Sequence, residues 1–217
     1  AIDSTFVSSV GAYVDRFEQE LAAYLKAAYA VVTVNGTTAL QVALKLAGVQ
    51  KGDEVITQPL TFVATANAIA HNNASPVFVD VNRETLGLCP DALERFLNRT
   101  ARKTSIGTTN TTTGNVIRAI VPMHTFGHPC RMQQIVELAD EWNLVVVEDA
   151  AEALGSSIAL NPVNRTEKKL CATFGRLGIL SFNGNKTITC GGGGAIITND
   201  KQLAERARHL TTTAKIP

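Results

Sequence analysis

The sequence predicts an α/β fold with a mainly parallel sheet flanked by helices. Segments with the composition of strands alternate with segments that have helical spacing over most of the 217 residues. In addition, Val145–Val147 is a run of three valines, which is typical of a strand buried on both faces. Sheets of this kind bind their ligands at the carboxyl ends of the strands, and Asp149 follows the valines at such an end.

The individual elements follow from apolar spacing and from turn residues. The predicted helices are residues 13–29, 37–47, 61–72, 91–98, 132–143 and 200–210. The predicted strands are residues 30–34, 53–57, 76–81, 116–121, 145–147 and 195–197. Two polar segments, residues 100–115 and 161–169, are expected to be surface loops, the first of them mobile.

The composition limits the possible functions. Charged residues make up 18% of the chain, where about a quarter is usual, so we expect part of the surface to be covered in an oligomer. A formal net charge of +1 and the absence of Lys or Arg runs argue against a nucleic-acid partner. No apolar run approaches the roughly 20 residues that span a bilayer, and no signal-peptide pattern is present, so a cytoplasmic protein is expected.

The four cysteines, Cys89, Cys130, Cys171 and Cys190, have no spacing typical of metal ligands. They are expected to be reduced thiols with structural roles, and no metal site is predicted.

Lys186 is a candidate for chemistry because it is the one charged residue in the segment 181–195. The four glycines at 191–194 would let the backbone approach a ligand closely, although they would equally suit a mobile loop. A phosphate-binding P-loop would need glycine directly before the lysine, and Asn185 stands there instead. The P-loop interpretation therefore fails.

Two further stretches complete the pattern. Asp149 at its strand end could bind a ligand, or it could only cap a following helix. In residues 34–40 a strand passes through Gly36 into a helix start, whose free N–H groups bind anions. A lysine amine, a strand-end carboxylate and an anion site are together the parts of a site for pyridoxal 5′-phosphate.

Four motifs occur in a fixed order, at residues 35–40, 61–69, 148–155 and 181–186. With them the chain, from about Phe17 to its end, resembles the DegT/DnrJ/EryC1/StrS sugar aminotransferases. The resemblance implies that residues 1–217 form the large, pyridoxal phosphate-binding domain of an aspartate-aminotransferase-like enzyme of fold type I. Members of the family have a short segment before the first helix, continue into a smaller C-terminal domain and form homodimers with shared sites. The chain is therefore expected to be a fragment that binds the cofactor weakly at most and lacks turnover by itself.

The resemblance also assigns roles to residues of the motifs. Lys186 matches the lysine that binds the cofactor covalently and moves a proton, and Asp149 matches the partner of the pyridine nitrogen. The other implied contacts are those of Gly36, Thr37 and Ser181 with the phosphate, of Phe62 with the face of the ring and of Glu152 with the 3′-oxygen.

Three positions leave alternatives open. Phe62 could instead be an ordinary core residue, which is the commoner situation for a phenylalanine at a helix start. His124 at a strand end could be a catalytic or substrate-binding group, or a structural histidine bonded to the backbone. Arg176 stands where the family usually has aspartate, which leaves the contacts of its loop open.

The implied reaction is amino transfer from glutamate to a nucleotide-linked 4-keto-6-deoxy sugar. Residues 183–194 are most similar to the LegC-like branch, which implies a UDP-linked N-acetylhexosamine and a role in surface-glycan or nonulosonic acid biosynthesis. One alternative is a sugar dehydratase of the same family, although that branch carries histidine at the position of Lys186. Another is a non-catalytic regulatory or assembly protein with this fold. A nucleotide-binding module would need a Gly-x-Gly-x-x-Gly motif, which is absent.

Overall fold

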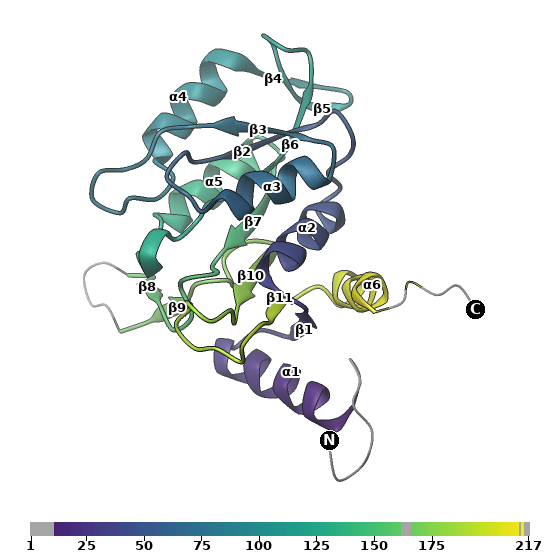
Figure 1. Ribbon diagram of the computed structural model, residues 1–217. Coiled ribbons are helices and arrows are strands. Elements are labelled where there is room, and N and C mark those ends of the chain that lie inside the picture. Colours follow the sequence, from purple (N-terminus) through teal and green to yellow (C-terminus); the bar gives the residue numbers. More distant parts are fainter. Residues whose placement is uncertain (1–10, 162–165, 213, 215–217) are drawn as a thin grey trace.

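The structure is a computed structural model that describes residues 11–161, 166–212 and 214 (Figure 1). In this part of the chain, one mixed sheet has the strand order β1-β11-β10-β7-β6-β2-β3, and β4 and β5 extend it from β6. Its strands are β1 (Tyr29–Thr33), β2 (Glu54–Thr57), β3 (Ser75–Phe78), β4 (Ala101–Thr104), β5 (Gly107–Asn110), β6 (Val116–Ile120), β7 (Val145–Asp149), β10 (Leu177–Ser181) and β11 (Gly194–Thr198). The strands β8 (Ser157–Ala159) and β9 (Lys168–Leu170) form a separate antiparallel pair.

The strands β10, β7, β6, β2 and β3 run parallel, whereas β11 and β1 add an antiparallel edge. The predicted α/β class is therefore confirmed. The helices are α1 (Ala12–Leu25), α2 (Gly36–Leu46), α3 (Val63–His71), α4 (Pro90–Thr100), α5 (Met132–Glu141) and α6 (Lys201–Thr211), with a short 3-10 helix η1 (Thr125–Gly127).

The helices cover both faces of the sheet. Apolar residues of α2, α3 and α6 pack with Val147 in one cluster on one face, and those of α4 and α5 pack with Val146 in a second cluster. Helix α1 covers the β1–β11–β10 end through a third cluster that contains Leu180. Because successive strand residues point to opposite faces, the valine run of β7 is buried from both sides, as predicted.

Most predicted elements are present with ends shifted by a few residues, and β10 was not predicted. The largest shift is at the first helix, which was expected to reach Tyr29 and ends at Leu25. Lys26 there adopts a left-handed conformation with φ of 56°, and the N–H of Ala27 bonds the carbonyl of Ala22. This closing turn ends the helix and releases the chain into β1.

Residues 100–115 lie largely on the surface, as expected, but the prediction of a loop is wrong, because β4 and β5 form a hairpin there that pairs with β6. The buried carboxylate of Glu54 stabilises the hairpin. It accepts hydrogen bonds from Asn110 at 2.8 Å and from Thr113 at 2.6 Å. The second predicted loop, 161–169, is corrected at its end, since Lys168 begins β9. Residues 162–165 lie outside the described residues.

No helix follows Asp149, so the interpretation of Asp149 as a helix cap is wrong. Residues 150–156 instead form turns, in which the Ala150 N–H bonds the carbonyl of Ile179 on β10. The four cysteines are free thiols. No helix of the described residues combines the length and the apolar character needed to cross a membrane.

Candidate active site

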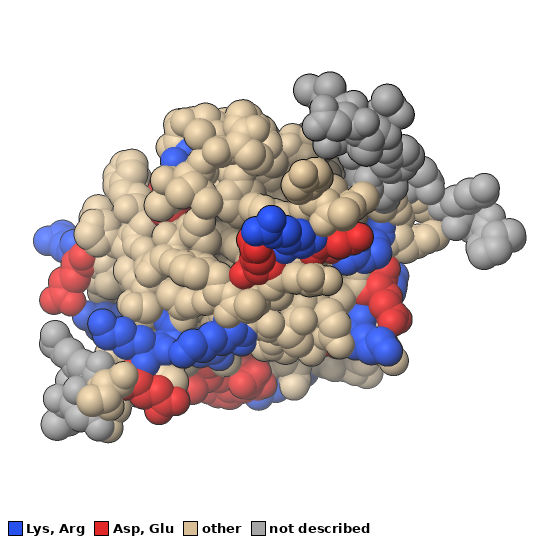
Figure 2. Space-filling model, turned by 90° about the horizontal axis from the view of Figure 1, so that it is seen from below, with Lys and Arg blue, Asp and Glu red and all other residues tan. Residues whose placement is uncertain are grey.

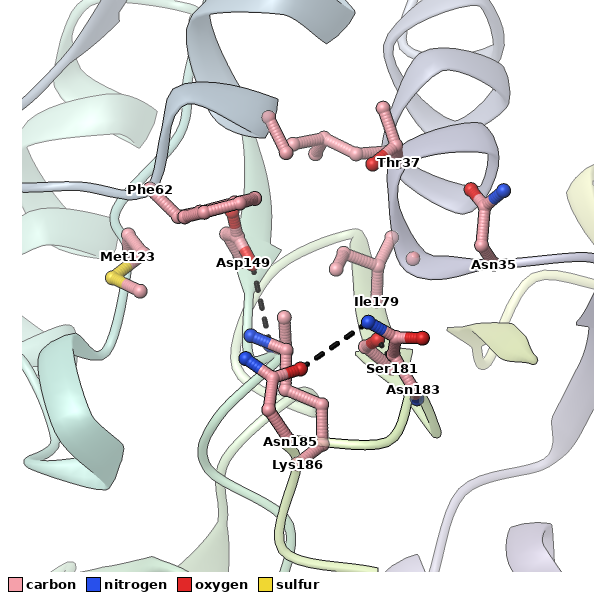
Figure 3. A pocket seen from close by; sticks show the side chains of 14 residues that line it. Asn35, Thr37, Phe62, Met123, Asp149, Ile179, Ser181, Asn183, Asn185 and Lys186 are labelled. Carbon is pink, nitrogen blue, oxygen red and sulfur yellow. Dashed lines mark hydrogen bonds between the residues drawn. The ribbon is translucent and has the colours of Figure 1, made fainter. Parts of the chain in front are cut away.

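A cavity of about 290 Å³ lies at the carboxyl ends of β7 and β10 (Figure 3). The start of α2, the start of α3 and the segment after β10 complete its walls. Six of the seven site residues expected from the sequence line it, namely Gly36, Thr37, Phe62, Asp149, Ser181 and Lys186. The seventh, Glu152, reaches it through an ion pair with Lys186. Gly36 and Lys186, which are 150 positions apart in the sequence, thus line the same cavity.

Lys186 lies in the turn after β10, where its N–H bonds the carbonyl of Asn183. Its side chain is only 10% exposed, and its Nζ lies 3.1 Å from Oε1 of Glu152. The same Nζ lies 5.7 Å from the centroid of the Phe62 ring. A mostly buried ammonium needs a counterion, and Glu152 supplies it. Oε2 of Glu152 accepts the N–H of Phe126 at 2.9 Å, which fixes the carboxylate from the other side.

Asp149 ends β7 and is 5% exposed. Its Oδ2 accepts a hydrogen bond from Oγ1 of Thr65 at 2.7 Å, and its Oδ1 accepts the N–H of Ala151 at 3.2 Å. Burial raises the pKa of Asp149, while the two hydrogen bonds and the positive charge of Lys186 act in the opposite direction. The carboxylate is thus poised to bind a cationic partner in the cavity.

The start of α2 offers an anion site. The N–H groups of Gly36 and Thr37 belong to the first helical turn, where no intrahelical acceptor exists. The side chain of Asn35 caps the helix by accepting the N–H of Thr38 at 2.8 Å. A Cβ on Gly36 would lie 2.8 Å from the Cβ of Ser181, so only glycine lets the helix start pack directly on Ser181. This packing places the Ser181 hydroxyl beside the free N–H groups.

Gly194, the last of the four glycines after Lys186, serves close packing. A Cβ on Gly194 would lie 2.5 Å from the carbonyl of Asn35, which caps α2. A larger residue would therefore push the Lys186 segment away from the helix start. Close approach is thus required at Gly194, where it is to the start of α2 and not to a ligand, whereas a Cβ on Gly191 would meet no atom within 4 Å.

Phe62 precedes α3 as its N-cap residue and is 62% exposed. The alternative that it is a core residue is therefore wrong. Figure 3 shows its side chain beside Asp149 at the cavity. An aromatic face at the wall of a cavity can cover a planar ligand.

His124 is fully buried and does not line the cavity. Its Nδ1 accepts the N–H of Cys130 at 3.1 Å, and its Nε2 lies 3.1 Å from Oε2 of Glu148. With Nδ1 as acceptor, Nε2 donates to Glu148; burial lowers the pKa of His124, but its hydrogen bonds raise it well above the ordinary value. Of the two interpretations of His124, the structural one therefore fits. Arg176 lies on the surface, 3.3 Å from Asp200.

The residues of the cavity fit pyridoxal phosphate. The helix start and Ser181 are suited to a phosphate, and Asp149 is suited to a protonated pyridine nitrogen. Lys186 supplies the amine that an aldehyde requires. No group of three His, Cys, Asp or Glu side chains in the described ranges could hold a metal ion.

Thr65, Met123, Asn183 and Asn185 are among the residues near the cavity that were not given a role from the sequence. Asn183 and Asn185 bond each other side by side, with the Nδ2 of Asn183 3.2 Å from the Oδ1 of Asn185. A signal for Thr65 was present, because its position four residues after Thr61 places two hydroxyls on one face of a helix.

Comparison with known proteins identifies the family of this chain. The family model described as "DegT/DnrJ/EryC1/StrS aminotransferase family" matches residues 1–215. GDP-perosamine synthase of Escherichia coli O157:H7 is 42% identical over 209 residues, which are 96% of this chain and 51% of that protein. The spore coat polysaccharide biosynthesis protein SpsC of Bacillus subtilis is 36% identical over 94% of this chain and 46% of its own length. The pleiotropic regulatory protein of Geobacillus stearothermophilus is also 36% identical, over 96% of this chain and 50% of its own length.

Solved structures of aminotransferases are also similar to this chain in fold and sequence. A DegT/DnrJ/EryC1/StrS aminotransferase from Brucella abortus superposes with a TM-score of 0.80 at 32% identity, covering 92% of this chain and 49% of that one. NtdA of Bacillus subtilis, solved with bound cofactor PMP, has a TM-score of 0.74 at 30% identity, covering 92% and 40%. The chain spans about half the length of the curated relatives that it matches. The family uses pyridoxal phosphate for amino transfer, and this chain belongs to the DegT/DnrJ/EryC1/StrS aminotransferase family.

Proposed function

We propose that this chain forms the cofactor site of an aminotransferase that moves an amino group from glutamate to a nucleotide-linked 4-keto-6-deoxy sugar. The observation that carries the proposal is the mostly buried amine of Lys186, which lies in one cavity with Asp149, Phe62 and a helix start. The family membership supports the same reaction class.

Each residue of the site has a defined task in this proposal. Bound pyridoxal phosphate supplies an electron sink for the carbon that loses or gains the proton. Lys186 holds the cofactor and carries that proton as general base and acid. Asp149 keeps a proton on the pyridine nitrogen, and Phe62 covers the ring. The remaining contacts are those of Gly36, Thr37 and Ser181 with the phosphate, and of Glu152 with the ammonium of Lys186 and the 3′-oxygen of the ring.

The assignment of Lys186 is tested by trapping the cofactor. Borohydride treatment of the chain with excess pyridoxal phosphate should fix the cofactor on Lys186, as peptide mass spectrometry detects, and Lys186→Ala should abolish this adduct. Lys169→Ala is the matched control, because Lys169 also lies over an aromatic ring, 4.8 Å from the centroid of Phe174, but outside the cavity. Trapping of the cofactor on other lysines with none on Lys186 of the wild-type chain would contradict the proposal.

The identity of the nucleotide that is linked to the sugar is the more specific part of the proposal. The LegC-like residues after β10 favour a UDP-linked N-acetylhexosamine in surface-glycan biosynthesis, whereas the name of the Escherichia coli relative contains a GDP-linked sugar. The name of SpsC agrees with a role in polysaccharide biosynthesis. Competition between UDP-linked and GDP-linked 4-keto-6-deoxy sugars for amination with glutamate decides between them, and preference for GDP would overturn the UDP assignment.

A regulatory protein is the second candidate, because one relative is named a pleiotropic regulatory protein. The two candidates differ in the first half of the reaction. An aminotransferase site converts pyridoxal phosphate and glutamate into pyridoxamine phosphate and 2-oxoglutarate without any sugar. Chromatography of the cofactor after incubation with glutamate therefore separates them, since a purely regulatory site leaves pyridoxal phosphate unchanged.

The proposal includes a homodimer in the cytoplasm. Tyr13, Phe17 and Tyr24 of α1 are exposed, and so are Phe126 and Ile188 near Glu152. Figure 2 shows, on the side of α1, broad areas without Lys, Arg, Asp or Glu side chains, separated by a group of charged side chains near the centre of the view. Such surfaces are commonly covered in assemblies. Sedimentation velocity measures the state directly, and a monomer at all concentrations would contradict this part.

A further inference from the structure

A chain of two threonine hydroxyls leads to Asp149. Thr65 on α3 is fully buried, and its Oγ1 lies 2.7 Å from Oδ2 of Asp149. Thr61, one helical turn earlier and partly exposed, has its own Oγ1 2.7 Å from that of Thr65. Both distances are those of good O–H···O hydrogen bonds.

The direction of this chain follows from counting protons. Each hydroxyl has one proton to donate, and an ionised carboxylate can only accept. Thr65 therefore uses its proton for Asp149, and the proton between the two threonines comes from Thr61, whose other acceptor, the carbonyl of Phe62, is farther away at 3.3 Å. A hydroxyl that accepts one hydrogen bond becomes a stronger donor in the next. Thr61 thus both orients and strengthens the bond from Thr65 to Asp149.

The carboxylate of Asp149 depends on few such donors. Its burial disfavours the ionised form, and the hydrogen bonds from Thr65 and Ala151 oppose that effect. The donor on Ala151 is a backbone N–H, which no substitution short of proline removes. The charges of Lys186 and His124 also lower the pKa of Asp149, but among the described residues Thr65 is the side chain that donates a hydrogen bond to its carboxylate.

We propose that Thr65 is a positioning residue for Asp149: its hydroxyl, oriented by Thr61, holds Oδ2 in place and keeps the carboxylate ionised. The remaining lone pairs of the carboxylate are then free to accept the N–H of a protonated pyridine ring. This last step rests on the proposed function, whereas the effect of Thr65 on the ionisation of Asp149 does not.

The experiment measures the ionisation of Asp149 in the full chain without cofactor. Carbon-13 NMR of labelled aspartate carboxyls gives its titration midpoint, and Asp149→Asn identifies the signal. Thr65→Val, which removes the hydroxyl and keeps the shape, should raise the midpoint by about one pH unit, and Thr65→Ser should restore it. Thr57→Val is the matched control, because Thr57 is equally buried and donates its hydroxyl to the carbonyl of Val121 at 2.8 Å.

A second measurement addresses the cofactor. The dissociation constant of pyridoxal phosphate, followed by its absorbance, should rise in Thr65→Val by up to about tenfold as the pH falls below the wild-type midpoint, because one pH unit of midpoint corresponds to a factor of ten. Thr65→Ser and Thr57→Val should stay close to the wild type. A purely packing role of Thr65 would instead affect Thr65→Ser, which lacks the methyl group, more than Thr65→Val.

The outcomes separate the two proposals. An unchanged midpoint in Thr65→Val overturns the role of Thr65. If the midpoints are as expected but the wild-type chain binds no pyridoxal phosphate, only the proposed function is overturned. If Thr65→Val does not fold, Thr61→Val carries the test, since the loss of its donated proton should raise the midpoint by several tenths of a unit. An unchanged midpoint in that variant then overturns the proposal.

Discussion

Glu148 and Asp149 show how neighbouring carboxylates at the end of one strand take different tasks. Successive side chains of a strand point to opposite faces, so Asp149 reaches the cavity and Glu148 points away from it. Glu148 is fully buried and accepts hydrogen bonds from the ring of His124 and from the backbone. Its backbone donors are the N–H groups of Ala172, Phe174 and Gly175, which precede β10. Glu148 thus fixes the loop that leads to Ser181 and Lys186.

Glu148→Gln should destabilise the protein strongly, because the amide nitrogen of glutamine would face backbone N–H groups that need an acceptor. We expect a loss of about 2–4 kcal/mol in the free energy of unfolding, measured with urea. Glu137→Gln, at an exposed site on α5, is the control and should change stability by less than about 0.5 kcal/mol. Equal stability of the two variants would show that the Glu148 network contributes little.

At the level of elements, the sequence predicts best those segments whose periodicity is strong. The valine run of β7 and the amphipathic α5 were found because apolar residues alone specify them. The hairpin β4–β5 was missed because its stabilising contacts are polar and its apolar content is low. Threonine favours strands, but only the tertiary pairing with β6 shows that this preference prevails here.

In the candidate site, too, features within one segment can be predicted from the sequence, whereas contacts between segments cannot. Lys186 and Asp149 could be predicted, because an isolated lysine and a strand-end carboxylate are conspicuous in the sequence. The ion pair of Lys186 with Glu152 and the bond of Thr65 to Asp149 could not, since they join separate segments. Such contacts depend on the register in which the segments meet, and the spacing within one segment does not contain that information.

The hairpin β4–β5 should be the element most sensitive to the Glu54 network. Asn110 is buried and uses both ends of its amide, donating to Glu54 at 2.8 Å and accepting the N–H of Thr112 at 2.9 Å. Asn110→Ala removes both bonds and should cost about 1–3 kcal/mol in the free energy of unfolding.

Amide hydrogen exchange localises this effect. Protection of Thr108 and Thr109, which pair with β6, should fall in Asn110→Ala while protection of β7 changes only with global stability. Thr112→Ala is the matched control, because the Thr112 side chain is exposed. Unchanged protection in β5 would show that the hairpin is held by strand pairing alone.

At the scale of the whole molecule, the charged residues of the cavity lower the free energy of unfolding of the empty protein. The sheet gathers Asp149, Glu152 and Lys186 at one end, where their charges are largely removed from water. Sites of this kind are destabilising in the empty protein and favourable only with their ligand. Asp149 is the clearest instance, because burial raises its pKa above that of the unfolded chain.

The pH dependence of this cost has a definite sign. Between the pKa of Asp149 in the unfolded chain and its raised value in the fold, the native state binds more protons than the unfolded state. The free energy of unfolding therefore falls as the pH rises through this window, and the full cost persists above it. Below the unfolded pKa the carboxyl is protonated in both states, and the cost vanishes.

Asp149→Asn should therefore stabilise the empty chain at neutral pH while it weakens the binding of pyridoxal phosphate. The amide oxygen can still accept the N–H of Ala151, and the amide nitrogen can donate to Thr65, whose hydroxyl then donates to Thr61. We expect a gain on the order of 1 kcal/mol at pH 7 and none near pH 3, measured by urea unfolding at both values. Asp140→Asn, at an exposed site on α5, is the control and should show no comparable gain. A variant that is less stable than the wild type at every pH would show that the hydrogen bonds of the carboxylate outweigh the burial of its charge.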